Sequence, residues 1–330
     1  MADPAEPTAA EPTAAEPTAA EPIATPQPEG PPGRRTTVAQ RRRREAALGY
    51  ALVAPALVVF GVFVFYPLVR TIQLGFYRAA PFPGLPNKAV GLSQYRRVLG
   101  SSDFRSSLKV TVLFGLYTVP TGIVLGTLLA LLAHQRLRAI GLFRTIFSST
   151  VATSVAVASV IFFTLLNPQV GLFSYWLGKV GGNGVLQDPR WALPAVAVAT
   201  VWQNLGFTFV LLSAALQSIP DELLEAARVD GAGAWPRFWQ VTLPLLSPTL
   251  MFAAVIGGIA AFQAFGQIDL LTQGGPLNHT RVLTYYLYQE AFLRNNDGVA
   301  AVLAVALFVI SLVLTLLQLR LLERRVFYAR

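Results

Sequence analysis

Four carboxylates stand close together in one polar segment of the chain. They are Asp221, Glu222, Glu225 and Asp230. Carboxylates can form charge-assisted hydrogen bonds with basic groups of a partner protein. No obvious nucleophile or acid–base pair accompanies them, and the absence of cysteine excludes a thiolate nucleophile or thiolate metal site. The segment therefore indicates binding, and we expect neither catalytic nor metal-ligating residues in this chain.

Long apolar stretches flank this segment and must position it. Only 13% of the 330 residues are charged and 54% are hydrophobic, whereas a soluble domain usually carries about 25% charged residues. Each stretch has about 20 or more residues, enough to cross a ~30 Å hydrocarbon core, with charges only at edges, Lys109 and Arg144. Buried helices of a soluble protein would show a polar face, which these lack. We expect an all-α, polytopic protein with six transmembrane helices, at about 48–69, 109–133, 143–166, 191–216, 245–268 and 299–319.

Arginines next to the first stretch predict its orientation. Six of them precede it, Arg34, Arg35 and Arg41 to Arg44, whereas only Arg70 and Arg78 follow closely. Basic residues favour the cytoplasmic side of a span. With an even number of spans, we expect both the N- and the C-terminus in the cytoplasm of a bacterial cell, in a multi-pass protein of the cytoplasmic membrane.

The first segment differs from the rest of the chain. From Ala5 to Ala24 a five-residue unit repeats, AEPTA three times and then AEPIA. Proline-rich sequence with few large apolar side chains cannot offset the entropy cost of ordering, and the segment lacks the apolar stretch of a secretory signal. We therefore divide the chain into a disordered tail with a basic juxtamembrane segment, 1–45, and a membrane domain, 46–330, whose functional loop is 218–246.

The apolar stretches contain no group that could couple transport to an ion gradient. Proton and sodium relays use Asp, Glu, His or Lys at mid-membrane, and the two histidines, His134 and His279, both fall in predicted loops. The phosphate-binding pattern GxxxxGK[ST] is absent as well. An ion-coupled secondary transporter is thus disfavoured, and energy must come from another protein.

The loop 218–246 has the local signals of two short helices. Pro220 followed by Asp221 and Glu222 is typical of a helix start. The sequence DGAG at 230–233 should end that helix, and Pro236 should begin a second one, before Pro244 leads into the next span. Exposed apolar side chains on such helices favour a protein partner; the alternative is an ordinary loop on the bilayer surface.

Two motifs in this arrangement resemble a known family. Glu225-Ala226-Ala227 with Asp230-Gly231-Ala232, ending in Leu243-Pro244, resembles the EAA loop of permease subunits of ABC importers. The stretches 268–280 (IDLLTQGGPLNHT) and 284–292 (TYYLYQEAF) are similar to the carbohydrate-uptake branch. The resemblance covers about 48–330. The segments 163–171 and 316–330 look most like the A subunits of glycerol-3-phosphate or glycerophosphodiester importers.

The resemblance implies a type I ABC importer permease fold and a transport subunit that is not an enzyme. It implies coupling to a cytoplasmic ATPase dimer, which binds ATP and Mg, so that this chain needs no cofactor. It further implies a second homologous permease subunit in a heterodimer and an extracytoplasmic solute-binding lipoprotein. The coupling residues carried over by position are Glu225, Ala226, Ala227, Asp230, Gly231 and Ala232. For Asp230, a hydrogen bond at the helix end is an alternative or additional role.

Polar and aromatic side chains in the fourth and fifth stretches are candidates for a solute pathway, as the corresponding helices are in related sugar permeases. Aromatic faces can stack on sugar rings, and amides can bond hydroxyl groups; helix packing is the alternative role. The spacing of Gly122 and Gly126 favours close helix contact. The solute-pathway candidates are Trp202, Asn204, Phe207, Phe209, Phe262, Gln263 and Gln267.

The resemblance points to glycerol 3-phosphate, a glycerophosphodiester or a related carbohydrate as the solute. A neutral di- or oligosaccharide is the alternative, because no basic residue lies mid-span to meet a phosphate. A membrane enzyme acting on lipids lacks catalytic groups. The net charge of +9 could suggest nucleic-acid binding, but the basic residues are scattered along the membrane flanks and indicate topology.

Overall fold

The computed structural model describes residues 38–78, 88–135, 140–169, 171–173 and 184–323. The predicted disordered tail falls almost entirely within 1–37, outside the described residues. The chain divides into two units, residues 1–60 and 61–330. In the first unit, helix α1 (Val38–Phe60) contains the arginine cluster 41–44 and the first half of the first predicted span.

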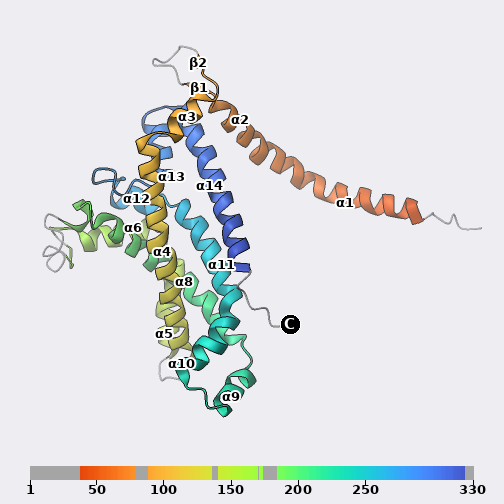
Figure 1. Ribbon diagram of the computed structural model, residues 1–330, viewed down its shortest axis with the longest axis vertical. Helices are drawn as coiled ribbons and strands as arrows, with labels where there is room; N and C mark the ends of the chain where they lie inside the picture. The colour runs from red at the N-terminus through yellow and green to blue at the C-terminus, as the bar shows by residue number, and fades with distance from the viewer. Residues whose placement is uncertain (1–37, 79–87, 136–139, 170, 174–183, 324–330) are drawn as a thin grey trace, which may run out of the picture. The chain divides into compact units, whose positions relative to one another are not determined.

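The second unit is helical apart from one small antiparallel ribbon, in the part of the chain that the structure describes. The ribbon pairs β1 (Tyr77–Arg78) with β2 (Lys88–Ala89). Shorter helical segments connect the long helices (Figure 1). In chain order the helical segments are η1 (Gly61–Phe65), α2 (Tyr66–Leu74), α3 (Ser93–Leu99), α4 (Ser102–His134), α5 (Ile140–Ser148), η2 (Ser149–Ala152), α6 (Val155–Leu166), η3 (Val185–Gln187), α8 (Ala192–Gln217), α9 (Asp221–Val229), α10 (Ala234–Arg237), η4 (Phe238–Thr242), α11 (Leu243–Phe262), α12 (Gly266–Leu271), α13 (Leu283–Tyr288), η5 (Gln289–Leu293) and α14 (Asp297–Glu323).

Five helical stretches of the described chain are long and apolar enough to cross a membrane, and a bent pair makes a sixth if it counts as one span. The expectation of a continuous third span at 143–166 is wrong: α5 and η2 meet α6 at 107°. The Oγ of Ser154 accepts a hydrogen bond from the backbone N–H of Val157, 3.2 Å away, and so caps a new helix there. The five single stretches are Glu45–Leu74, Ser102–His134, Ala192–Gln217, Ala234–Phe262 and Asp297–Arg320.

The fifth predicted span, 245–268, differs at both ends from the helix that the structure shows there, Ala234–Phe262. No separate short helix begins at Pro236, because α10, a five-residue π-helical turn (η4) and α11 run on continuously. Pro236 lies in the first turn, where its missing N–H costs no helical hydrogen bond. Pro244 is the second residue after the π-helical turn, which has already altered the helical hydrogen-bond pattern. At the other end, α11 stops at Phe262, and Gln267 belongs to the separate helix α12.

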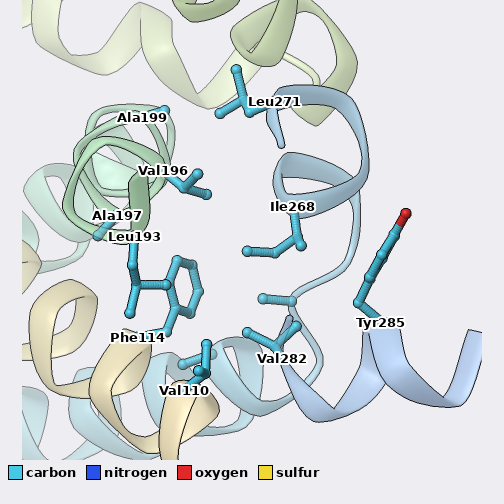
Figure 2. Packing of buried hydrophobic residues seen from close by; sticks show 12 residues of the cluster. Val110, Phe114, Leu193, Val196, Ala197, Ala199, Ile268, Leu271, Val282 and Tyr285 are labelled. Atoms are coloured by element: carbon cyan, nitrogen blue, oxygen red, sulfur yellow. The ribbon is translucent and has the colours of Figure 1, made fainter. Parts of the chain in front are cut away.

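The main core joins α4, α8, α12 and the segment entering α13. Phe114, Val196, Ile268 and Val282 are almost fully buried there. Figure 2 shows these side chains pointing toward one another from segments distant in sequence. Apolar contact of this kind fixes the broken α11–α12 region against the two long helices.

Helices α4 and α8 lie side by side and run in the same direction. Near their starts Val110 and Leu193 share one core, and near their ends Ala130 and Leu212 share another. Helix α9, in the loop 218–246, follows the end of α8. In the second unit, α3 and α13 therefore lie at one end, with α9 and α10 at the other (Figure 1).

Candidate functional site

The first helix of the loop 218–246 forms as the sequence predicts. Pro220 precedes α9 in an extended conformation, and Asp221 and Glu222 occupy its first turn. Their negative charges interact favourably with the positive end of the helix dipole, and Arg228 in the last turn complements the negative end. These local interactions stabilise a nine-residue helix none of whose residues is buried.

A glycine with a left-handed backbone ends α9. Gly231 has a φ of +81°, which costs a residue with a side chain but not glycine. The N–H of Gly231 bonds the carbonyl of Arg228 at 3.0 Å, and the N–H of Ala232 bonds that of Ala227 at 2.9 Å. This pair of bonds is the Schellman arrangement of a helix end. The predicted break at DGAG is confirmed, and its cause is backbone geometry.

The coupling candidates form an exposed surface. Glu225 and Asp230 are exposed, and neither has an ion pair or side-chain hydrogen bond within the described residues. The alternative role of Asp230, a hydrogen bond at the helix end, is thus not seen. Val229 is 88% exposed and Trp235 is 71% exposed. Apolar and acidic groups therefore face outward together, as on surfaces that bind proteins.

Three aromatic rings that follow the turn at Gly231 in the chain pack together. The ring centroids of Phe238 and Trp239 are 5.4 Å apart, and Trp235 and Trp239 are 5.7 Å apart in an edge-to-face arrangement. Edge-to-face aromatic pairs add stability beyond their buried area. The cluster therefore gives α10 and η4 a defined shape beside the exposed α9.

A cavity of about 310 Å³ lies between the middle of α4, the middle of α8, α11 and the break before α12. Such a volume is at the small end of the range for small-molecule sites. Its lining is mainly apolar, with amides and hydroxyls converging on it and no charged side chain among its lining residues. Of the seven predicted solute-pathway residues, four line it: Asn204, Phe207, Gln263 and Gln267.

Amide hydrogen bonds connect the cavity wall to the broken helices. Nε2 of Gln267 donates to Oε1 of Gln203 at 3.4 Å. Nε2 of Gln203 in turn donates to the carbonyl of Thr153, at the bend between η2 and α6. These two hydrogen bonds connect the bend before α6 to the break before α12 through the cavity wall. No group of three or more His, Cys, Asp or Glu that could hold a metal occurs in the described residues.

The other three predicted pathway residues lie in helix packing. Trp202 contacts Phe162 of α6, with ring centroids 5.6 Å apart. Phe209 is 2% exposed and lies near two phenylalanines of α5. The ring of Phe262 is buried, and its backbone carbonyl accepts a hydrogen bond from the hydroxyl of Thr284 at 2.7 Å. None of the three lines the cavity.

The two glycines of the GxxxG pattern have different roles. At Gly126 an added Cβ would come within 2.6 Å of Cγ2 of Thr208, so this glycine does permit close helix contact. The same expectation is wrong for Gly122, which has open space around it and lines the cavity. Thr118 and Thr200 also line the cavity. They were not predicted as pathway residues, because both look like ordinary small polar residues in apolar helices.

Residues 272–282, between α12 and α13, form a tightly hydrogen-bonded loop at the α3–α13 end, and we call it the second-motif loop. The hydroxyls of Thr272 and Thr280 are 2.7 Å apart, and the Thr280 hydroxyl also donates to the carbonyl of Gly275. Beside this loop, burial and the nearby Asp269 carboxylate raise the pKa of Tyr285 to about 12. Tyr285 therefore stays protonated at neutral pH.

Comparison with known proteins assigns the family. Residues 122–328 match the family described as binding-protein-dependent transport system inner membrane component. The chain belongs to this family, and it is a multi-pass permease subunit of an ABC importer. Its role is transport across the inner membrane, not catalysis.

Two relatives are permeases named for one solute. The chain is 37% identical over 286 residues to the sn-glycerol-3-phosphate transport system permease protein UgpA of Agrobacterium fabrum. The aligned region covers 85% of this chain and 96% of the relative. It is 33% identical over 287 residues to the UgpA of Pectobacterium atrosepticum, with 86% and 97% covered.

A solved structure has the same fold. A bacterial ABC transporter involved in the import of the acidic polysaccharide alginate contains a chain with a TM-score of 0.72 and 24% identity, covering 87% of this chain and 98% of that one. A second structure of the alginate transporter, in complex with a periplasmic protein bound to an alginate pentasaccharide, matches equally well. The expected type I importer fold is confirmed.

Proposed function

We propose that this permease carries sn-glycerol 3-phosphate, or a phosphodiester of glycerol, across the inner membrane. The observation that carries the proposal is the 37% identity with the Agrobacterium fabrum permease over nearly the whole of that relative. The cytoplasmic side is the end with α9 and α10, and both termini lie on it. The arginine cluster at 41–44 supports this orientation.

The solute passes through the cavity between α4, α8, α11 and α12. Asn204, Gln263 and Gln267 provide amides that bond hydroxyl groups, and Phe207 provides an aromatic face. Asn204, Phe207 and Gln263 are exposed in the single chain. The wall is therefore incomplete on one side, and a second, homologous permease subunit closes it in a heterodimer.

The helix α9 couples the permease to a cytoplasmic ATPase dimer, which binds ATP and Mg. Its exposed position, with Glu225, Ala226 and Ala227 followed by the turn at Asp230, Gly231 and Ala232, supports this role. The carboxylates pair with basic groups of the ATPase, and the apolar side chains enter its surface. On the opposite side, an extracytoplasmic solute-binding lipoprotein delivers the solute.

A neutral di- or oligosaccharide is the second candidate solute. One observation favours it: the 310 Å³ cavity has no charged side chain among its lining residues. An anionic solute would have to leave water there without a partner charge, which is costly.

Uptake by the complete importer tests the proposal. The permease is reconstituted in proteoliposomes with its partner permease and ATPase. ATP is enclosed in the lumen, on the same side as the ATPase, and the solute-binding protein is added outside. We expect ATP-dependent accumulation of radiolabelled sn-glycerol 3-phosphate. Accumulation of maltose with exclusion of sn-glycerol 3-phosphate would overturn the solute assignment, and accumulation without the ATPase would overturn the coupling.

A further inference from the structure

A second cavity lies at the α3–α13 end of the permease. It has a volume of about 270 Å³ and is lined by the start of α4, the residues that lead into α8 and the second-motif loop. Three separate segments each supply one basic or imidazole side chain to it: Lys109, Arg190 and His279. We call it the outer cavity. Three such groups from three segments make a concave electropositive site.

No carboxylate neutralises these groups in the part of the chain that the structure describes. Lys109, Arg190 and His279 are exposed and form no ion pair there. The two nearest acidic residues in sequence do not line the cavity. Asp188 accepts the backbone N–H of Arg190 at 2.8 Å, and Asp103 is paired with Arg281. The two cationic groups and the imidazole are therefore available to an anion.

The position of His279 is fixed by the loop that carries it. The next two residues, Thr280 and Arg281, are both buried and hydrogen-bonded. Before it, Leu277 and Asn278 both have left-handed backbones, with φ of +49° and +64°. The N–H of His279 bonds the carbonyl of Pro276 at 2.9 Å. The backbone at His279 therefore needs little reorganisation when a ligand binds.

The outer cavity lies closer to the α3–α13 end than the cavity proposed for the solute. On α4 it is lined between Ser106 and Tyr117, and the inner cavity between Thr118 and Ile123. On α8, Pro194 lines the first and Thr200 the second. From Lys109 to Thr118 the rise along the helix is about 14 Å. A solute that enters from the α3–α13 end would therefore meet Lys109, Arg190 and His279 before it reaches the inner cavity.

We propose that the outer cavity binds the phosphate group of the incoming solute, with Lys109, Arg190 and His279 as its ligands. This inference rests on the proposed function and assigns its phosphate recognition to this chain. Lysine and arginine supply charge-assisted N–H donors, and the imidazole supplies a further donor. The uncharged inner cavity then contacts the glycerol part, so that charge is recognised where water still reaches the solute.

Neutralising variants test the site in the reconstituted importer. We compare Lys109→Gln, Arg190→Gln, His279→Asn and the triple variant at subsaturating sn-glycerol 3-phosphate. The matched control is Arg97→Gln, an exposed arginine of α3 outside the cavity. We expect the triple variant to lose uptake by roughly tenfold, Lys109→Arg to retain it, and the control to match the parent. Unchanged uptake in the triple variant would overturn the proposal.

A second measurement reports the charge of the cavity without any solute. Because the chain has no cysteine, Ser106→Cys places a single thiol in the outer cavity. We expect a thiosulfonate reagent that carries an anionic sulfonate group to modify this thiol faster than one that carries a cationic ammonium group. The mass of this chain measures the extent of modification. The triple variant should lower that ratio by roughly tenfold. An unchanged ratio would overturn the electropositive site.

The two failures and the competing ligand are distinguishable. If the parent importer does not transport sn-glycerol 3-phosphate, the solute assignment is wrong. If the parent transports it and the triple variant transports it equally well, only the proposed phosphate site is wrong. Carboxylates of the solute-binding protein could bind the same three side chains instead. In that case the triple variant would need a higher concentration of binding protein for half-maximal stimulation of ATP hydrolysis. Saturating binding protein would restore full uptake, and our proposal would be wrong.

Discussion

The guanidinium of Arg281 donates from Nη2 to Oδ1 of Asp103, 2.5 Å away, and joins residues 178 positions apart in sequence. The Arg281 side chain is 4% exposed and that of Asp103 is 51% exposed. The guanidinium also lies over the ring of Tyr286, 4.6 Å from its centroid. This ion pair attaches the second-motif loop to the first turn of α4.

Removing the carboxylate should destabilise the permease. Asp103→Ala leaves a buried guanidinium without its partner, although solvent around Asp103 weakens the pair. We expect a loss of roughly 1–2 kcal/mol, which lowers the apparent Tm in detergent by about 2–8 °C. Glu222→Ala, which removes an exposed carboxylate, is the control. Equal Tm values for the two variants would contradict a stabilising role for the pair.

A side chain at Gly231 should impair coupling. Gly231→Ala places a Cβ on a left-handed backbone, which costs roughly 1–2 kcal/mol, and so favours a different end for α9. We expect uptake and the stimulation of ATP hydrolysis to fall together, with membrane insertion unchanged. Gly233→Ala is the matched control, because φ at Gly233 is −64°. Full transport by Gly231→Ala would argue against this turn as a coupling element.

Glu225 and Glu222 lie one helical turn apart and should differ in function. Both are exposed on α9, but only Glu225 lies in the stretch that resembles the EAA motif. We expect Glu225→Gln to abolish transport and reduce copurification of the ATPase after mild detergent extraction. Glu222→Gln should retain both. If the two variants behave alike, the assignment of coupling to Glu225 is wrong.

The two glycines of the GxxxG pattern in α4 should respond oppositely to alanine. Gly126→Ala forces its Cβ against Thr208, and overpacking costs roughly 1–3 kcal/mol. Gly122→Ala meets open space and should leave the Tm equal or slightly higher, because alanine favours a helix by up to about 1 kcal/mol. Gly122→Leu should then reduce uptake by narrowing the cavity. A lower Tm for Gly122→Ala would contradict this.

The sequence predicts the number and location of the membrane helices well, because an apolar stretch must be long enough for the bilayer whatever its partners are. It does not predict the bends. The cap at Ser154 and the end of α11 at Phe262 depend on hydrogen bonds and packing that hydropathy does not describe. The GxxxG spacing likewise cannot separate Gly126 from Gly122, since the difference lies in whether α8 approaches.

Helix α9 was predictable because its signals are local: Pro220 at the start, acidic residues in the first turn and Gly231 at the end. The cavity proposed for the solute was only partly predictable. Phe207 and Phe209 are two residues apart and equally aromatic, but a helix turns them to different sides, one lining the cavity and one buried against α5. The outer cavity was missed because its lysine, arginine and histidine come from distant segments.

The uninterrupted course of α8 has a mechanical consequence. Its 26 residues span about 39 Å, from the outer cavity, past the inner one, to the start of α9. A rigid rod that pivots near its middle moves its ends in opposite directions. A pull on α9 that tilts α8 by about 10° would displace each end by about 3 Å. Such a rod would widen the pathway at one face of the membrane as it narrows it at the other.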